Sequence, residues 1–545
     1  MKIPTKAFTL FMVILMALGL SSGGQNSRGE SDQIAVVEMQ QFKDIKAKAD
    51  NGDVESQCWL ASCYNSGLFG CKIDKEQSQE LFQKVAKNAN ENLAAVQYCK
   101  GICYDNGYGV TKDLDEAAQW FRKAAEQGFA PSQNALGVCY ANGEGVPKDD
   151  QKALEWYRKA ADQGFAISQS NIGGWYASGR VVEKNEKTAV EWYRKATEQG
   201  FAPAQDNLGL CYYNGDGVEK DLNNAAKWFS KAAEQGYAKA QRNLGFCYYK
   251  GYGVEKDLNN AVKWCRLAAE QGLDIAQNNL GLCYESGHGV EKDLKEAVNW
   301  YRKAAEQGYA EAQYNLGFCY DCGLGVPENP VEAVKWYRLA AEQGNPRAQT
   351  ELASYYEEAE GNDAEAVKWF TKAVEQEYPE AQNRFGTYYS RKQNYREAFK
   401  WFQKAAEQEH ADAQYSVGVL LYQGEGAPPN IGIPRNVAES VKWLQKAADR
   451  GHPGGMLGLA AYYEEQGNDQ EVFKLYLKAA EQEHIIITQA PRFKSLVFLA
   501  QCLLGNSYEH GLGVKKDMQE AVRWYRKAAE GGNADAQKAL RELGY

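Results

Sequence analysis

Apolar and polar positions repeat with a helical period along most of the chain, and residues 130–165 show the pattern clearly. Four residues at positions i, i+3, i+4 and i+7 share one face of a predicted helix: Gln133, Leu136, Gly137 and Tyr140. A glycine inside a helix costs about 1 kcal/mol relative to alanine. Gly137 therefore predicts that another helix approaches closely at this point.

The same stretch predicts a loop and a second helix. The Gly-x-Gly sequence at 143–145 ends the first helix, Val146 can fill the loop, and Asp149 is a good N-cap. Gly164 then ends the second helix, whose predicted buried residues are Ala153, Trp156, Tyr157, Ala160 and Ala161. Capping-box spacings start three other second helices, at Asp113/Glu116, Asp293/Glu296 and Asp517/Glu520.

This unit recurs with a period of 36 residues. Gln marks the period at Gln97, Gln133, Gln169, Gln205, Gln241, Gln277, Gln313 and Gln349. Trp keeps the same register at 120, 156, 192, 228, 264, 300 and 336 and, after shorter steps, at 369, 401, 443 and 524. A fixed period of 20–50 residues indicates stacked supersecondary units, because one helix pair cannot bury both of its faces. The predicted fold is all-α: a right-handed α/α superhelical solenoid of about twelve helix pairs, its handedness taken by analogy with tetratricopeptide proteins.

Departures from the period divide the chain into five predicted segments. They are a signal peptide (1–24), a linker and N-terminal capping helix (25–52), the solenoid (53–424), irregular repeats with loop insertions (425–500), and a C-terminal repeat with its cap (501–545).

The first segment has the order of a secretory signal. Lys2 and Lys6 precede an apolar run at 7–20, and small residues follow at 21–24. We therefore expect an exported protein, periplasmic or secreted; an uncleaved N-terminal anchor is the alternative. The sequence contains no Asn-x-Ser/Thr site, which favours a bacterial source.

Composition narrows the function classes. Apolar residues make up 44% and charged residues 25% of the 545-residue chain, as in a packed domain. The net charge of −10 argues against nucleic acid or anionic lipid as the partner. No second apolar segment near the length of a membrane span occurs, so stable membrane insertion after signal cleavage is not expected.

The repeated motif resembles the Sel-one-like repeat (SLR) family over roughly residues 53–545. One unit reads Ala310-Glu-Ala-Gln313, Leu316-Gly317, Tyr320, Gly323-x-Gly325-Val326, and then Ala333-Val334-Lys-Trp336-Tyr337-Arg-x-Ala340-Ala341-Glu-Gln-Gly344. The resemblance implies an α/α solenoid and an adaptor that assembles protein complexes, in bacteria often exported and in contact with envelope or host proteins.

The resemblance also implies two other functions. A cysteine-rich branch of Helicobacter type, with a disulfide in each unit, is described as binding or hydrolysing β-lactams. The matching stretch 304–313 lacks those cysteines, which puts both the disulfide framework and an enzyme acting on β-lactam or cell-wall substrates in doubt. The second alternative is an adaptor of a protein quality-control complex.

Seven of the 13 cysteines share one register, each before the Tyr of a first helix: Cys63, Cys103, Cys139, Cys211, Cys247, Cys283 and Cys319. Neighbouring first helices should lie about 8–10 Å apart, too far for a disulfide between equivalent positions. We therefore expect these seven cysteines to act as small buried apolar residues. A disulfide or part of a metal site stays open for Cys99 with Cys103, Cys319 with Cys322, and Cys58 with Cys99.

The sequence contains no motif for catalysis, metal or cofactor binding. Its five histidines are dispersed, and His410 and His484 stand where Tyr or Phe usually occupies the turn between units. The Gly-x-Gly loops follow helices rather than strands, which excludes a dinucleotide fold. We expect a non-enzymatic protein without a cofactor.

A partner is expected on the concave face, which the first helices line. Three positions face away from the predicted core: one, five and eight residues after the register Gln, written Gln+1, Gln+5 and Gln+8. The predicted protein-binding residues are Tyr98, Ile102, Val138, Leu210, Tyr213, Arg242, Phe246, Tyr249, Leu282, Tyr314 and Phe318. These positions mix aromatic, aliphatic and charged groups, as protein-binding surfaces do. The alternative is that the neighbouring unit buries the Gln+5 residues.

Overall fold

The computed structural model describes residues 40–424, 432–483 and 491–545. The predicted signal peptide lies outside these residues, as do positions 425–431 and 484–490 in and beside the predicted irregular segment. The chain forms two compact units, Met1–Trp300 and Tyr301–Tyr545. Within the described ranges all regular structure is helical, and no strand occurs.

Unit 1 is a run of helix pairs. Its first helices are α3 (Val54–Ser66), α5 (Ala94–Asn106), α7 (Ala130–Asn142), α9 (Ala166–Ser178), α11 (Ala202–Asn214), α13 (Ala238–Lys250) and α15 (Asp274–Ser286). Its second helices are α4 (Lys75–Ala86), α6 (Leu114–Glu126), α8 (Asp150–Asp162), α10 (Glu186–Thr197), α12 (Leu222–Glu234) and α14 (Leu258–Glu270). Residues 40–50, before the first pair, are also helical.

Unit 2 follows the same plan, and α16 (Leu294–Glu306) spans the division between the units. Its first helices are α17 (Ala310–Cys322), α19 (Pro346–Glu358), α21 (Pro379–Arg391), α23 (Ala411–Gln423), α25 (Pro453–Glu465), α28 (Lys494–His510) and α30 (Ala534–Glu542). Its second helices are α18 (Pro330–Glu342), α20 (Asp363–Val374), α22 (Tyr395–Glu407), α24 (Val437–Asp449), α26 (Asp469–Ala480) and α29 (Met518–Glu530).

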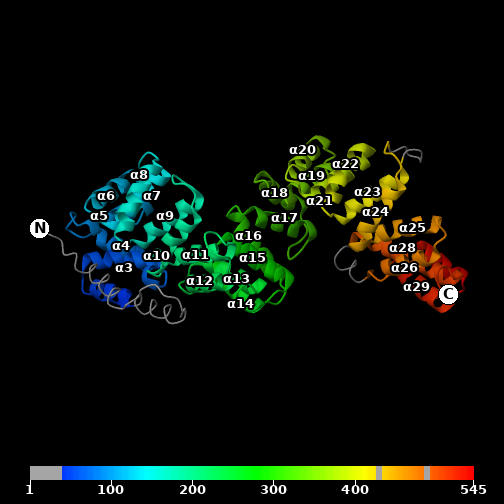
Figure 1. Ribbon diagram of the computed structural model, residues 1–545, viewed down its shortest axis with the longest axis horizontal. Helices are drawn as coiled ribbons and strands as arrows, with labels where there is room; N and C mark the ends of the chain where they lie inside the picture. Colours follow the sequence, from blue (N-terminus) through cyan, green and yellow to red (C-terminus); the bar gives the residue numbers. More distant parts are fainter. Residues whose placement is uncertain (1–39, 425–431, 484–490) are drawn as a thin grey trace. The chain divides into compact units, whose positions relative to one another are not determined.

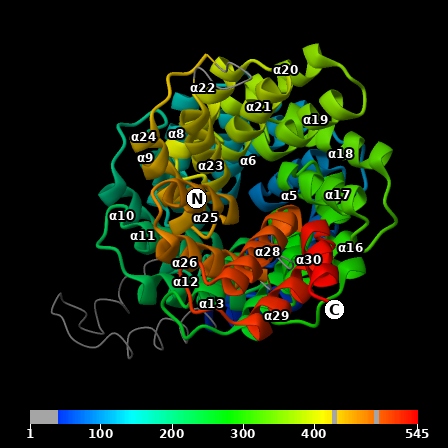
Figure 2. The same cartoon turned by 90° about the vertical axis from the view of Figure 1, so that its right-hand side faces the viewer.

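Within each unit, consecutive helices pack against one another, and the two helices of a pair make the most extensive contacts (Figure 1 and Figure 2). The predicted all-α solenoid of helix-pair repeats is therefore confirmed. Its right-handed superhelical sense stays a prediction.

The predicted N-caps form, but only half of each capping box does. An Oδ1 atom of Asp113 accepts from the backbone N–H of Glu116 at 3.0 Å. The second bond of a capping box would run from the backbone N–H of Asp113 to the side chain of Glu116. It does not form, because this N–H donates to the carbonyl of Tyr104 at 2.9 Å instead. This bond ties the loop to the preceding helix.

The helix glycines mark a close approach, as predicted. A Cβ atom on Gly137 would lie 2.6 Å from a ring carbon of Tyr157, on the second helix of the same pair. Gly209 stands in the same relation to Phe229, and Gly317 to Tyr337. The helix pair therefore packs a ring directly on the glycine backbone, which no larger residue would allow.

The second glycine of several Gly-x-Gly loops has a steric reason of its own. Gly145 has φ 66°, and a Cβ atom there would lie 2.0 Å from the carbonyl oxygen of Leu114, in the preceding pair. Gly253 meets Leu222, and Gly289 meets Leu258, in the same way. The loop thus packs on the start of the preceding second helix.

Part of the Trp register is less buried than predicted, although Trp300, Trp369 and Trp524 are buried. Trp156 and Trp228 are half-buried, while Ala153, Tyr157, Ala160 and Ala161 are buried as expected. Lys159 Nζ lies 3.8 Å from the ring centroid of Trp156. The Trp rings thus seal the edge between neighbouring pairs, where a lysine one turn later covers the exposed side.

Long-range packing joins the first pair of unit 1 to later turns. Trp59 on α3 makes edge contacts with the rings of Phe129 and Phe165, at centroid distances of 6.2 and 5.9 Å. After α3, the short helix η1 (Leu68–Gly70) places the backbone N–H of Phe69 3.1 Å from the carbonyl of Gln199. The first repeat of unit 1 therefore covers the connections that follow α6, α8 and α10.

Candidate functional site

Four of the predicted binding residues are exposed on first helices of unit 1. Leu210, Phe246 and Leu282 occupy Gln+5 positions and are 38%, 38% and 43% exposed, and Tyr249 at Gln+8 is 37% exposed. Tyr213 and Arg242 are half-buried beside them. Burial of the Gln+5 position by the neighbouring repeat is therefore excluded on α11, α13 and α15.

Two predicted residues belong to the core instead. Tyr98 and Tyr314, both at Gln+1, are 9% and 5% exposed. Tyr98 packs against Phe82, Phe121 and Phe129, with ring centroids 5.7–6.0 Å apart. The Gln+1 position faces the neighbouring first helix, so neither ring is available to a partner.

Ile102 and Val138 are half-buried Gln+5 residues that pack on hydrophobic clusters of their own repeats. They lie nearer the N-terminus than the exposed group. Phe318 is exposed on unit 2, where its ring stacks on Tyr314 with centroids 6.3 Å apart. Ile102 and Val138 are therefore not part of the exposed group on α11, α13 and α15, and Phe318 is described with unit 2 alone.

We call the exposed group, together with the rings that contact it, the aromatic patch. Its residues are Leu210, Tyr213, Phe246, Tyr249, Tyr252, Leu282 and His288. The rings of Tyr213, Phe246 and Tyr252 contact one another, with centroids 6.0–6.4 Å apart. Tyr249 contacts His288 at 6.1 Å. Tyr213 and Tyr252 also pack on the buried core of α12 and α13, which gives the patch a rigid base.

The sequence did not predict Tyr252 and His288 as surface residues of this site. Each is the middle residue of a Gly-x-Gly loop, and the sequence pattern was interpreted only as the end of a helix. The loop folds back against the end of its first helix, because the N–H groups of Gly251 and Tyr252 both donate to the carbonyl of Cys247. An aromatic residue between the two glycines is the signal that could have placed them at this surface.

Two lysine side chains lie close to rings of the patch. Lys220 Nζ lies 5.7 Å from the ring centroid of Tyr213, and Lys250 Nζ lies 5.3 Å from that of Tyr249. Neither lysine forms an ion pair with another residue of the described ranges. The edge of the patch therefore carries positive charge that an acidic partner could neutralise.

A buried carboxyl group lies next to the patch. Asp206, at Gln+1 of α11, is 3% exposed, and its Oδ1 accepts from Nδ2 of Asn243 on α13 at 2.8 Å. Burial raises the pKa of Asp206 to about 6, although Asn243 and Arg242 favour the charged form. This bond joins the two first helices that carry most of the patch.

Consecutive first helices of unit 2 are joined at three places by a polar contact of the same kind, which we call a latch. The N-cap residue of one first helix also binds an acid on the preceding first helix: Asn345 with Glu311, His410 with Glu380, and His452 with Asp412. His410 accepts the N–H of Ala413 at Nδ1, and its Nε2 lies 2.9 Å from Glu380. The hydrogen bond with His410 lowers the pKa of Glu380 to about 2. The polar groups of Asn345 and His410 form hydrogen bonds within the protein, which is typical of a structural role, while Nε2 of His452 lies 3.6 Å from Asp412.

Chemistry-bearing clusters are otherwise lacking in the described part of the chain. No group of three or more His, Cys, Asp or Glu side chains there could hold a metal ion. No described helix is both long and apolar enough to cross a bilayer.

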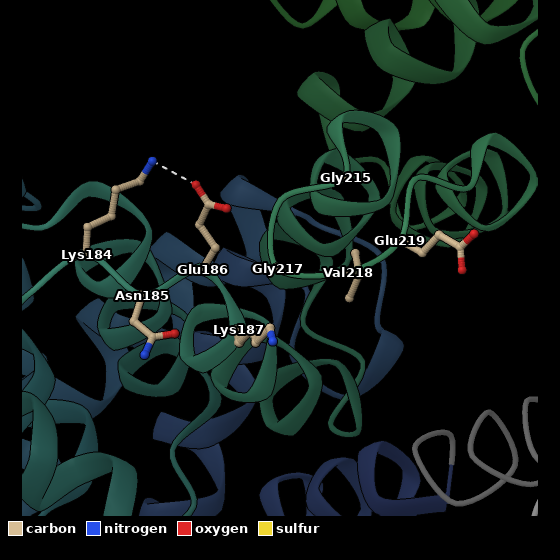
Figure 3. A pocket seen from close by; sticks show the side chains of 8 residues that line it. All are labelled: Lys184, Asn185, Glu186, Lys187, Gly215, Gly217, Val218 and Glu219. Atoms are coloured by element: carbon tan, nitrogen blue, oxygen red, sulfur yellow. Dashed lines mark ion pairs between the residues drawn. The ribbon is translucent and has the colours of Figure 1, made fainter.

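A shallow depression in unit 1 lies between the loop that leads into α10 and the Gly-x-Gly loop after α11 (Figure 3). Lys184 and Glu186 pair across its rim at 2.7 Å, and Asn185 caps α10 through the N–H of Thr188. A Cβ atom on Gly217 would lie 2.3 Å from the carbonyl oxygen of Glu186. The depression is the gap left by this repeating loop contact, and Lys184, Asn185 and Glu186 at its edge already have partners within the protein.

Comparison with known proteins agrees with the repeat pattern. The Sel1 repeat matches thirteen stretches: 54–90, 92–129, 130–165, 166–201, 202–237, 238–273, 274–309, 310–345, 346–378, 379–410, 411–452, 455–484 and 499–533. A search of curated proteins found no match.

Two solved structures illustrate the similarity. A protective antigen present in uropathogenic Escherichia coli strains, with an SLR fold, is 33% identical over 85% of this chain and 90% of its own, with a TM-score of 0.56. A Sel1 repeat protein from Oxalobacter formigenes is 36% identical over 45% of this chain and 96% of its own, with a TM-score of 0.40.

Proposed function

Because the chain belongs to the Sel1 repeat family, whose solenoids typically act as scaffolds for protein–protein interaction, we propose that it binds a protein or peptide segment through the aromatic patch. The observation that carries the proposal is the exposure of four large apolar side chains, Leu210, Phe246, Tyr249 and Leu282, on three consecutive first helices.

The make-up of the patch supports this use. Tyr and Phe supply large contact area at little cost in side-chain entropy, and such residues dominate binding energy at interfaces. Tyr213 and Tyr252 are held by the core beneath them, so the surface is organised before a partner arrives. The residues of the patch also vary from repeat to repeat more than the register Gln and Gly positions do.

The expected partner carries large apolar side chains followed or preceded by carboxylates. Apolar groups match Leu210, Phe246 and Leu282, and carboxylates match Lys220 and Lys250 at the edge. Burial of the patch by the partner would supply most of the binding affinity. The two lysines would raise the association rate and make this rate depend on the salt concentration.

We place this scaffold outside the cytoplasm, in the periplasm or the medium. The support is the pattern of residues 1–24, which has the basic, apolar and small-residue order of a secretory signal. The Escherichia coli neighbour is described as a protective antigen, which agrees with a surface that a host can reach. N-terminal sequencing of the exported chain tests this part; recovery of an intact Met1 contradicts cleavage.

A peptide library displayed on phage and selected on chain 25–545 tests the binding function. The enriched peptide is then titrated by fluorescence anisotropy against the unaltered protein and a Phe246→Ala/Tyr249→Ala variant. We expect the double variant to weaken binding at least tenfold, equivalent to about 1.4 kcal/mol or more.

The matched control replaces two exposed apolar residues on α18, with Val331→Ala/Leu339→Ala. This variant should bind as the unaltered protein does, and circular dichroism should show full helicity for both variants. Equal weakening by both pairs, or no effect of the first, contradicts the assignment of the patch.

A further inference from the structure

Two cysteines of the first repeat come together in unit 1 although the sequence places them in different elements. Cys63 lies in α3, and Cys71 follows η1. Gly67, with φ 72°, ends α3 and donates its N–H to the carbonyl of Cys63 at 2.8 Å. On the other side of Cys71, the N–H of Asp74 donates to the carbonyl of Tyr64 at 2.8 Å. These two bonds fold the loop back onto the last turn of α3.

The loop differs from its equivalents in other repeats. Phe69 has φ 55° and takes the place that a left-handed glycine, such as Gly109, has in the regular Gly-x-Gly loop. The side chains of Cys63 and Cys71 enter one hydrophobic cluster, at 0% and 5% exposure. Interaction with the Cys71 thiol, followed by burial, raises the pKa of the Cys63 thiol.

We infer that Cys63 and Cys71 are a disulfide-forming pair that staples the first loop of the solenoid to α3. This inference is independent of the proposed binding function. No other loop carries a cysteine at the position of Cys71, so the staple would be specific to the first repeat.

The chemistry requires an oxidant of the disulfide class, for which oxidised glutathione serves. The Cys71 thiolate attacks one sulfur of oxidised glutathione and releases one glutathione thiolate. The Cys63 thiolate then attacks the sulfur of Cys71 in the mixed disulfide and releases the second. Two protein thiols lose their hydrogens, one protein disulfide forms, and one oxidised glutathione becomes two reduced ones.

The staple would act on a contact between distant repeats. The loop donates from the N–H of Phe69 to the carbonyl of Gln199 at 3.1 Å and from that of Ile73 to the carbonyl of Gln235 at 3.4 Å. A disulfide holds the loop in the conformation that makes both bonds, because it removes open conformations of the loop. Oxidation should therefore tighten the packing of the first repeat on later ones.

The test folds chain 25–545 from denaturant in mixtures of reduced and oxidised glutathione. After acid quenching and alkylation, cleavage at Trp59, Tyr64 and Phe69 separates Cys58, Cys63 and Cys71 for mass spectrometry. We expect a Cys63–Cys71 link as the main product, and amide exchange at Phe69 and Ile73 several-fold slower than in the reduced chain.

Cys71→Ser should abolish the link and the oxidant-dependent change in exchange, whereas Cys139→Ser and Cys247→Ser should leave both in place. The unaltered chain keeps the test decisive if a variant fails to fold. Free thiols at both positions in a fully helical chain, or links from Cys58 to Cys63 or Cys99 instead, overturn the inference.

Discussion

Gln163 donates a hydrogen bond from Nε2 to the Oε1 atom of Gln133, 2.7 Å away, within one repeat. Gln133 in turn donates to the carbonyl of Ala125, in the preceding repeat, at 3.3 Å. The same link recurs between Gln127 and Gln97, Gln199 and Gln169, Gln235 and Gln205, Gln271 and Gln241, Gln343 and Gln313, Gln376 and Gln349, and Gln408 and Gln382. The 36-residue period of Gln therefore has a physical cause, because each buried amide joins one repeat to the next.

Gln133→Leu should destabilise this junction by about 1–3 kcal/mol, since Ala125 and Gln163 each lose a buried partner. Urea unfolding followed by amide exchange in α7 and α8 measures the loss. Gln151→Leu, at an exposed position on α8, should change stability by less than about 0.5 kcal/mol. Similar losses for both substitutions would contradict the role given to the Gln link.

Gly145→Ala and Gly128→Ala separate a steric contact from a backbone preference. Both glycines have positive φ, at 66° and 87°, but only at Gly145 would an added Cβ atom lie within 3 Å of a backbone atom. We expect Gly128→Ala to cost about 1–2 kcal/mol and Gly145→Ala about 3 kcal/mol or more. Thermal unfolding followed by circular dichroism compares them, and equal shifts would count against packing of the loop on Leu114.

Asp206 predicts a pH dependence of stability. Its folded pKa of about 6 exceeds the ordinary value of 3.8, so the folded state binds more protons between these values. Stability should therefore fall as the pH rises from about 4 to about 6 and stay lower above, by at most about 3 kcal/mol. Asp206→Asn should remove this dependence and retain the bond with Asn243.

The measurement for Asp206 is urea unfolding of the unaltered chain and the variant at pH 4 to 8. Asp221 offers a contrast of opposite sign, because the backbone N–H of Asn224 lowers the pKa of its carboxyl group. The hydrogen bond by which Asp221 caps α12 is kept at neutral pH. It is weakened as the pH falls below the ordinary carboxyl pKa of 3.8. An Asp206→Asn chain whose stability follows pH as the unaltered chain does would refute the account.

The histidine latch in unit 2 depends on two ring nitrogens with different tasks. At His410, Nδ1 caps α23 and Nε2 faces Glu380. His410→Asn should keep the cap, as Asn345 does in an earlier turn, and cost less than about 1 kcal/mol. His410→Ala loses both bonds and should cost about 2 kcal/mol or more. Unfolding of the two variants side by side checks this order, and an Asn variant as unstable as the Ala variant contradicts it.

The fold could be predicted from sequence because most repeats place the same residue types at the same packing contacts. Gly137 and Tyr157 illustrate this, since a glycine in a helix face and a ring in the next helix imply one close contact. The exposure of Trp156 could not be predicted from composition alone, because it depends on how neighbouring pairs meet and on the lysine that covers the ring.

The candidate site was predicted less completely. Tyr98 and Tyr249 are the same residue type on the same kind of helix, yet Tyr98 is core and Tyr249 is surface. The difference arises because Gln+1 faces the next first helix, as the bond between Asp206 and Asn243 shows. Contacts such as Phe69 with Gln199 join residues far apart in the sequence, and no local pattern contains them.

The aromatic patch as the binding surface is tested most directly by site-specific photo-crosslinking. A benzophenone-bearing amino acid replaces Tyr249 in one chain and Leu339, exposed on α18, in another, and each is irradiated with the peptide that display selects. The account predicts a crosslink from position 249 that excess unlabelled peptide suppresses, and none from position 339. Crosslinking from 339 alone, or equal crosslinking from both, would contradict it.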